Sequence, residues 1–172
     1  MAEPRWLDET EQHAWRQLAA LLLRLPAALE QQLQRDAGMT HFEYWVVALL
    51  SEAPERRLRL SQLAAYANAS LSRLSHVVTR LEQRGWVARE RCPDDARASF
   101  AVLTDAGYDQ VVAAAPDHVE HVRLLVFDGL DRDDVVSLAR ICEAIVRRVD
   151  APPTASAAPV TRPATRRRGA GR

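Results

Sequence analysis

The most regular hydrophobic pattern in the chain predicts an amphipathic helix over residues 70–84. Its apolar residues are spaced so that they share one helical face: Leu74, Val77, Val78 and Leu81. Ser70 can cap the start of this helix, and Gly85 can end it in the left-handed conformation. The opposite face is polar and carries no acid: Ser72, Arg73, Ser75, His76, Thr79, Arg80 and Gln83. We expect the apolar face to pack in a core and the polar face to remain available to a partner.

The residues on either side of this helix predict a shorter helix before it and a β-hairpin after it. Residues 86–91 and 99–103 have the composition of strands, and the turn-rich segment 92–97 between them indicates a β-hairpin. An isolated hairpin is only marginally stable in water, so we expect it to pack on the helix and to present its Arg-bearing tip outward. A shorter helix capped by Ser61 is predicted to end at Ala67, with Asn68 in the turn before the amphipathic helix.

Longer helices are predicted before and after this central part, over residues 8–36, 105–127 and 132–149. A further helix begins at the capping box Thr40-x-x-Glu43. Its expected core stripe consists of Phe42, Trp45, Val46, Leu49 and Ala53. The Arg-rich segment 55–59 that follows is expected to be a loop.

The first and the last of the predicted helices carry narrow apolar seams. The seam of the first helix consists of Leu18, Leu22, Leu25 and Leu29. The seam of the last consists of Val135, Leu138, Cys142, Ile145 and Val149. This spacing is typical of helices that pack lengthwise on another helix. Because the whole central part separates the two seams, they cannot pair in a simple hairpin, and we expect the chain to dimerise through them.

The distribution of charge indicates a polyanionic partner for the central part. The net charge of the chain is zero, but residues 56–97 hold nine Arg and four acidic residues, a local charge of +5. Concentration of positive charge on a helix and a hairpin is typical of proteins that bind DNA. Residues 151–172 add five Arg and no acid. This tail cannot build a core, so we expect it to be disordered and able to touch DNA phosphates.

The motifs of the central part resemble the winged helix-turn-helix of the MarR (multiple antibiotic resistance regulator) family. The most specific motif is Asp95-x-Arg97 followed by Leu103-Thr104-x-x-Gly107, and the resemblance covers roughly residues 10–149. It implies a mostly α fold with a small β-hairpin wing and with N- and C-terminal helices that form a dimerisation region. In this family the wing Arg enters the minor groove and the Asp helps to hold the wing, so the resemblance implies these roles for Arg97 and Asp95.

The hydrophobic pattern and the family resemblance together predict four segments in the chain and a function for the whole. The parts are a dimerisation helix in residues 1–38, a winged helix-turn-helix DNA-binding domain in 39–104, dimerisation helices in 105–150 and the disordered Arg-rich tail. We expect a homodimeric repressor that binds an inverted repeat in double-stranded DNA and is released by a small aromatic or phenolic effector. The predicted DNA-binding residues are Ser61, Ser70, Ser72, Arg73, Ser75, His76, Thr79, Arg80, Arg89, Arg91, Asp95 and Arg97. Four residues are candidates for an effector pocket, although an aromatic stripe is more often core: Trp15, His41, Tyr44 and Trp45.

Two alternatives remain open from the sequence. Cys92 lies beside the basic hairpin tip, where neighbouring Arg would favour the thiolate, so the chain could be a redox-sensing regulator. It could also be a winged-helix module that binds proteins. No nucleophile–base pair, phosphate loop or metal-ligand spacing appears in the sequence, so neither an enzyme nor a metal or cofactor is predicted. With only Cys92 and Cys142, an acidic N-terminal segment and no apolar run of membrane length, we expect a cytoplasmic protein.

Overall fold

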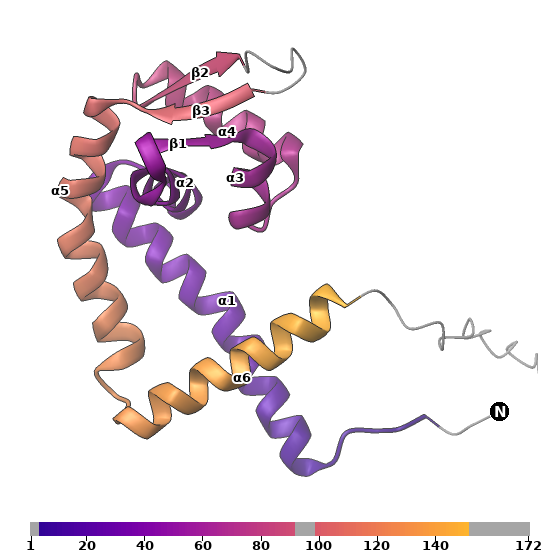
Figure 1. Ribbon diagram of the computed structural model, residues 1–172. Helices are drawn as coiled ribbons and strands as arrows, with labels where there is room; N and C mark the ends of the chain where they lie inside the picture. The colour runs from indigo at the N-terminus through magenta and orange to yellow at the C-terminus, as the bar shows by residue number, and fades with distance from the viewer. Residues whose placement is uncertain (1–3, 92–98, 152–172) are drawn as a thin grey trace, which may run out of the picture. The chain divides into compact units, whose positions relative to one another are not determined.

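The structure, a computed structural model, describes residues 4–91 and 99–151 of the chain. It is mostly helical with one small sheet, as the sequence predicts (Figure 1). The chain divides into two compact units, Met1–Gly129 and Leu130–Arg172. The first unit contains α1 (Glu9–Ala37), α2 (His41–Glu52), β1 (Arg57–Arg59), α3 (Leu60–Tyr66), α4 (Leu71–Gln83), β2 (Val87–Arg91), β3 (Ser99–Leu103) and α5 (Asp105–Val122). The second contains α6 (Arg132–Asp150).

The core of the first unit is built around α2 and α4. The predicted apolar face of α4 is confirmed, because its buried residues are Leu74, Val77, Val78 and Leu81. The prediction for α2 is wrong in part. Trp45 is 45% exposed, whereas Tyr44, Val47 and Leu50 are buried. The physical reason is that α2 contacts α1, α3, α5 and β3, and a helix with neighbours on several sides does not bury a single periodic stripe.

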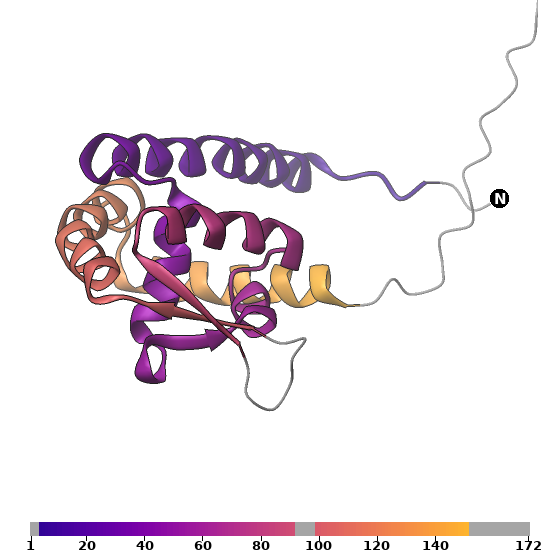
Figure 2. The same ribbon diagram turned by 90° about the horizontal axis from the view of Figure 1, so that it is seen from above.

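The sheet has three strands in the order β1-β3-β2, all antiparallel, and β2 packs on α4 (Figure 2). The predicted hairpin of β2 and β3 is therefore confirmed, but the Arg-rich segment predicted as a loop supplies the third strand. In β1, Leu58 pairs with Ala101 of β3. A run of three residues carries too little pattern to be recognised, and β1 forms because it satisfies the second edge of β3.

The helix-turn-helix differs from the prediction at one end of its first helix. α3 begins at Leu60 with Arg59 as its N-cap, so Ser61 lies in the first turn and is not the cap. The amide of Arg59 donates to Oε1 of Gln62 at 3.4 Å. The N-cap amide therefore has a hydrogen-bond acceptor, although the N-cap residue carries no hydroxyl. The turn between α3 and α4 follows the prediction, because Asn68 has a left-handed φ of 48°.

The Leu-Thr-x-x-Gly motif forms the junction between the sheet, α4 and α5. The Thr104 hydroxyl accepts from the amide of Gly107 at 3.1 Å and donates to the carbonyl of Gly85 at 2.7 Å. The amide of Thr104 donates to the carbonyl of Trp86 at 3.0 Å. A Cβ on Gly107 would lie 2.1 Å from that same carbonyl oxygen. The motif therefore needs a hydroxyl that caps α5 and a residue without a side chain where α5 meets the end of the hairpin.

The end of α5 differs in its hydrogen bonding from a regular α-helix, whereas α6 follows the prediction. α5 ends at Val122 and is followed by a π-helical turn, Arg123–Phe127, in which the amide of Asp128 donates to the carbonyl of Arg123. The predicted helical extent to Phe127 is therefore confirmed, but its last turn is π-helical and not α-helical. α6 matches its predicted range, and none of its residues is buried. Within the described residues, no helix has the length and apolarity needed to cross a membrane.

Candidate nucleic-acid interface

The outer face of α4 is positioned by its buried face and by its cap. The hydroxyl of Ser70 accepts from the amide of Arg73 at 3.2 Å, so Ser70 is engaged in the helix start. Five predicted contact residues further along the helix are exposed: Ser72, Arg73, His76, Thr79 and Arg80. Ser75 is half-buried. The sequence therefore predicts the orientation of this helix correctly, but its polar side chains are not equally available to a partner.

Arg73 is presented by an aromatic ring of α2. Its guanidinium lies over the ring of Phe42, 4.2 Å from the ring centroid. Within the described residues it has no ion-pair partner. A guanidinium that stacks through its face keeps its N–H groups in the plane, where they can donate to two acceptors at once. Arg73 is therefore supported by Phe42, and no side chain among the described residues occupies its hydrogen-bonding edge.

Arg80 ties α4 to the start of α2. Its Nε donates to Oε1 of Glu43 at 3.1 Å, and the Glu43 side chain is only 4% exposed. The other oxygen of Glu43 accepts from the amide of Thr40 at 2.8 Å. One carboxylate thus completes the capping box of α2 and fixes Arg80. More than half of the Arg80 side chain is still exposed, so its remaining N–H groups can reach a ligand.

Arg89, which the sequence predicts as a DNA contact, points at α4. Its Nη2 lies 2.7 Å from the carbonyl of Ser75 and 3.0 Å from Oγ1 of Thr79. Its Nε lies 3.1 Å from Oε2 of Glu82. The structure therefore brings the predicted residues Ser75, Thr79 and Arg89 together. Their polar groups are hydrogen-bonded to one another.

The wing is described only in its strands. Arg91, the last residue of β2, is exposed. Three predicted residues lie outside the described residues, namely Cys92, Asp95 and Arg97. Arg57 and Arg59 of β1 add positive charge beside β3, with guanidiniums 4.0 and 5.5 Å from the ring centroid of Phe100. Neither is among the DNA contacts predicted from the sequence, because a run of three residues carries too little pattern to indicate a strand.

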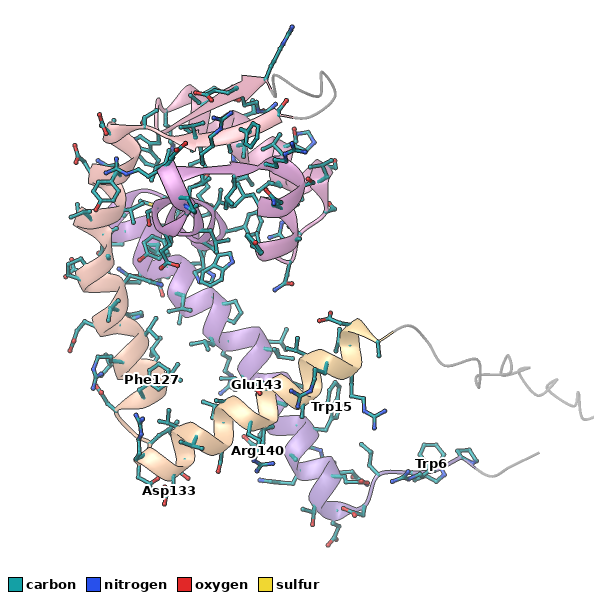
Figure 3. All side chains as sticks on the ribbon, in the orientation of Figure 1. Trp6, Trp15, Phe127, Asp133, Arg140 and Glu143 are labelled. Atoms are coloured by element: carbon teal, nitrogen blue, oxygen red, sulfur yellow. The ribbon has the colours of Figure 1, made fainter. Side chains whose placement is uncertain are left out.

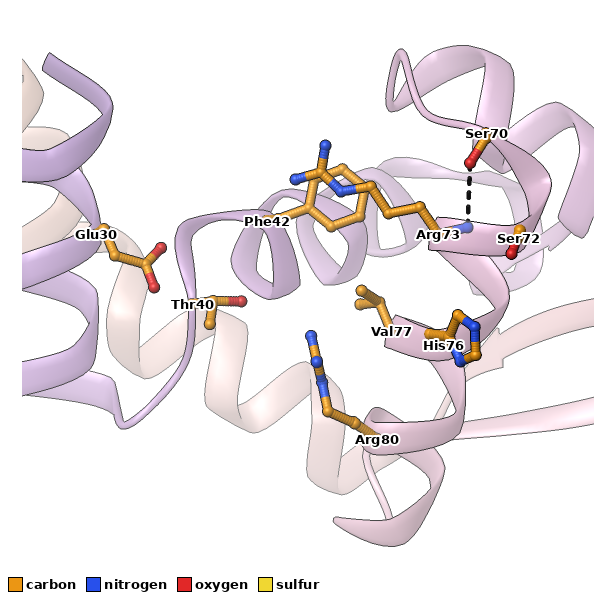
Figure 4. A pocket seen from close by; sticks show the side chains of 9 residues that line it. All are labelled: Glu30, Thr40, Phe42, Ser70, Ser72, Arg73, His76, Val77 and Arg80. Atoms are coloured by element: carbon orange, nitrogen blue, oxygen red, sulfur yellow. Dashed lines mark hydrogen bonds between the residues drawn. The ribbon is translucent and has the colours of Figure 1, made fainter. Parts of the chain in front are cut away.

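A cavity of about 570 Å³ opens between α4, the start of α2 and α1 (Figure 4). It is lined by Glu30, Thr40, Phe42, Ser70, Ser72, Arg73, His76, Val77 and Arg80. Glu30 accepts from the amide of His41 at 2.7 Å, which joins α1 to α2 at the edge of the cavity. The cavity thus combines one aromatic ring with two guanidinium groups on the face of α4.

The four predicted effector residues do not line this cavity and are not brought together. Trp15 projects from α1 and is exposed (Figure 3), as is Trp45 on α2. Tyr44 and His41 pack instead on His118 of α5. The ring centroid of His118 lies 4.4 Å from that of Tyr44 and 6.0 Å from that of His41. Tyr44 is therefore a core residue at the junction of α2 and α5, and His41 is half-buried beside it.

His118 belongs to a buried polar network between α1 and α5. Its Nδ1 donates to Oε1 of Gln32 at 3.1 Å, and Nε2 of Gln32 donates to Asp36 at 3.0 Å. Burial lowers the pKa of His118, and the nearby His41 and His121 lower it further. Burial also lowers the pKa of His41, against the opposing effect of Glu30. The neutral imidazoles are thus the forms that fit the packed network.

We expect the free energy of unfolding to fall when the pH is lowered below 6.5, the ordinary pKa of histidine. Because the folded pKa of His118 is lower than the unfolded one, the unfolded chain binds the proton more tightly. The contribution of neutral His118 to the free energy of unfolding is fully present above pH 6.5, and it is lost as the pH falls through the folded pKa. Urea unfolding between about pH 7.5 and about pH 5.5 measures this loss. In His118→Gln, which cannot protonate, the dependence should be weaker, and an equal dependence would contradict the assignment.

The predicted seam residues lie on α1 and α6, with different degrees of burial. Leu22 is 61% exposed, whereas Leu29 is 8% exposed and already packed within the first unit. Leu18 and Leu25 are half-buried, as are Val135 and Leu138 on α6. Ile145 and Val149 are exposed, and so is Cys142. Leu29 is therefore a core residue, and the other seam residues retain apolar surface.

Comparison with known proteins decides the family. A model of the MarR family matches residues 39–99. The MarR family transcriptional regulator Sco3205 from Streptomyces coelicolor, solved in complex with DNA, is 46% identical, with a TM-score of 0.84. That similarity covers 88% of this chain and 94% of Sco3205. The chain belongs to the MarR family.

Two further relatives agree with this assignment. The MarR family regulator AbsC from Streptomyces coelicolor is 39% identical over 85% of this chain and 98% of AbsC, with a TM-score of 0.81. The uncharacterised HTH-type transcriptional regulator YkoM from Bacillus subtilis is 28% identical over 58% of this chain. This chain spans 63% of the length of that curated relative.

Membership of the MarR family gives the elements their roles. The chain is a transcriptional regulator with a DNA-binding winged helix, and α3 and α4 form the helix-turn-helix. In such a motif the second helix, here α4, is called the recognition helix, and β2 and β3 are the strands of the wing. The MarR family is one of transcription regulators and not a class of enzymes. Among the described residues, no group of His, Cys, Asp or Glu is arranged to hold a metal ion.

Proposed function

We propose that this protein is a homodimeric repressor that acts in the cytoplasm and binds an inverted repeat in double-stranded DNA. The observation that carries the proposal is the outer face of α4, where Arg73 is stacked on Phe42 with its donor edge unused. In helix-turn-helix proteins the second helix enters the major groove, and an Arg edge there recognises guanine through two acceptors. Ser72 and His76 lie exposed on the same helix and would contact neighbouring bases or phosphates.

Dimerisation follows from apolar surface that the single chain leaves exposed. On α1 the exposed large apolar residues include Trp15, Leu21, Leu22 and Leu23, and on α6 they include Val136, Ile141, Ile145, Val146 and Val149. Surface of this kind on long helices is normally covered by a partner. A second copy of the chain supplies matching helices and a two-fold axis. The proposed parts are therefore the dimerisation helix in residues 1–38, the DNA-binding domain in 39–104 and the dimerisation helices in 105–150.

Release by a small aromatic or phenolic effector is supported by the cavity beside α4. A planar ring could stack near Phe42, and a carboxylate or phenolate could bind Arg73 or Arg80. A ligand on Arg73 would occupy the edge that the proposal assigns to DNA. Binding of the effector and binding of the operator would then exclude each other.

Footprinting on the promoter of the protein's own gene tests the proposal. The expected result is a protected inverted repeat with half-site centres about 10 base pairs apart and two chains for each operator, measured by sedimentation of the complex. Protection of a single unrepeated half-site by one chain would contradict it. Small aromatic acids and phenols, added one at a time, should release the operator from the wild type and less readily from Phe42→Leu. If no such compound releases it, the effector part of the proposal fails.

A further inference from the structure

One side chain of the strand β2, that of Arg89, forms several hydrogen bonds and an ion pair to the recognition helix α4. Arg89 places Nη2 within 2.7 Å of the Ser75 carbonyl, 3.2 Å of Ser75 Oγ and 3.0 Å of Thr79 Oγ1. Its Nε forms an ion pair with Glu82 at 3.1 Å. These contacts reach two successive turns of α4, and only 30% of the Arg89 side chain remains exposed.

The hydrogen-bond directions around Arg89 are mutually consistent. The Thr79 hydroxyl donates to the Ser75 carbonyl at 3.0 Å, so its oxygen lone pairs are available to accept from Arg89. Oxygen acceptors and the carboxylate of Glu82 surround a guanidinium that has only donors. Nε and Nη2 of Arg89 are thus both engaged within the protein. To bind a phosphate through both of these nitrogens, Arg89 would first have to leave Glu82 and α4.

The sheet explains why Arg89 reaches α4. Successive side chains of a strand point to opposite faces, so Val87 and Arg89 share the face of β2 toward α4, where Val87 is buried. Glu90 is on the other face and pairs with Arg57 of β1 at 3.4 Å. Arg89 and Glu90 on the two faces of β2 are therefore both paired within the protein, Arg89 with α4 and Glu90 with Arg57 of β1, across the central strand β3.

We propose that Arg89 is a positioning residue that fixes the wing to the recognition helix and does not contact DNA. This inference rests on the proposed DNA-binding function. Arg89 sets the angle between the recognition helix and the wing, so that the helix and the wing can enter their grooves of the duplex together. It also removes the hydroxyls of Ser75 and Thr79 from the set of base-reading groups and leaves that task to Ser72, Arg73 and His76.

Salt-dependent binding separates positioning from phosphate contact. Arg89→Ala is expected to weaken operator binding about tenfold without changing the slope of log K against log salt. Loss of a phosphate contact in each subunit would instead lower that slope by about 2 for a dimer. Arg91→Ala is the matched control, because it removes the same charge from the same strand and Arg91 has no hydrogen bond or ion pair among the described residues. A slope lowered by about 2 in Arg89→Ala would overturn the proposal, whether or not Arg91→Ala lowers it as well, because Arg91 is itself a predicted DNA contact.

Two further variants distinguish the two roles by their effect on the affinity for the operator. Glu82→Gln removes the acid that holds Arg89. If Arg89 is a positioning residue, operator binding falls, whereas an Arg freed to bind a phosphate would raise the affinity and steepen the salt slope. Arg89→Lys keeps the charge but cannot reach Ser75 and Glu82 with a planar fork. It should therefore behave like Arg89→Ala, and full rescue of binding by Lys would contradict positioning.

Hydrogen exchange in the free protein tests the tie without DNA. Exchange of the amides of β2 and β3 should be faster in Arg89→Ala than in the wild type, and unchanged in Arg91→Ala. Unchanged exchange in Arg89→Ala would show that the side chain does not hold the wing. If the wild type binds no duplex at all, the proposed function fails, and the exchange experiment still decides whether Arg89 fixes the wing to α4.

Discussion

Replacing Gly107 with alanine is expected to lower the free energy of unfolding by about 3 kcal/mol, the upper part of the usual range for overpacking. The new Cβ would lie 2.1 Å from the carbonyl oxygen of Trp86 and 2.8 Å from Cδ1 of Leu103. The carbonyl cannot simply move away, because it accepts from the amide of Thr104 at 3.0 Å. The clash therefore separates the start of α5 from the end of the hairpin.

Urea unfolding of Gly107→Ala beside Gly129→Ala measures this effect. Gly129 is the matched control, because its added Cβ would meet no atom within 4 Å. It should change the stability by no more than about 1 kcal/mol. If the two variants are equally stable, the Leu-Thr-x-x-Gly junction does not require close approach of α5 to Trp86.

Replacing Arg73 with alanine is expected to flatten the preference of the protein among DNA sequences. A bidentate contact between Arg and guanine contributes about 1 to 3 kcal/mol of discrimination, and a dimer loses it in both half-sites. The stack on Phe42, 4.2 Å away, orients the guanidinium before DNA is bound, so the whole contact is lost with the side chain. Binding to unrelated duplexes should weaken much less, since it depends mainly on phosphates.

Titration of the operator and of a scrambled duplex gives the comparison for Arg73→Ala. Arg140→Ala is the control, because it removes the same charge from an exposed position of α6. It should leave the ratio of the two affinities unchanged. An equal loss of affinity on both duplexes in Arg73→Ala would mean that Arg73 contacts the backbone and not a base.

The amino-acid sequence by itself determined the features that depend on neighbours along the chain. The buried face of α4 follows from residues three and four positions apart. The caps at Thr40, Ser70 and Thr104 each use an amide three residues further on. A helix face and a cap are satisfied within one or two turns, so no knowledge of the tertiary structure is needed to predict them.

Only the tertiary structure decided which polar residues of the interface remain available. Arg80 finds its acid 37 positions away in Glu43, and Arg89 finds Ser75 14 positions away. β1 exists because β3 offers it an edge, and Trp45 is exposed while Tyr44 is buried because several elements pack around α2. A charged side chain binds whichever opposite charge the fold places within reach, and that distance depends on how the elements pack and not on the spacing of residues along the chain.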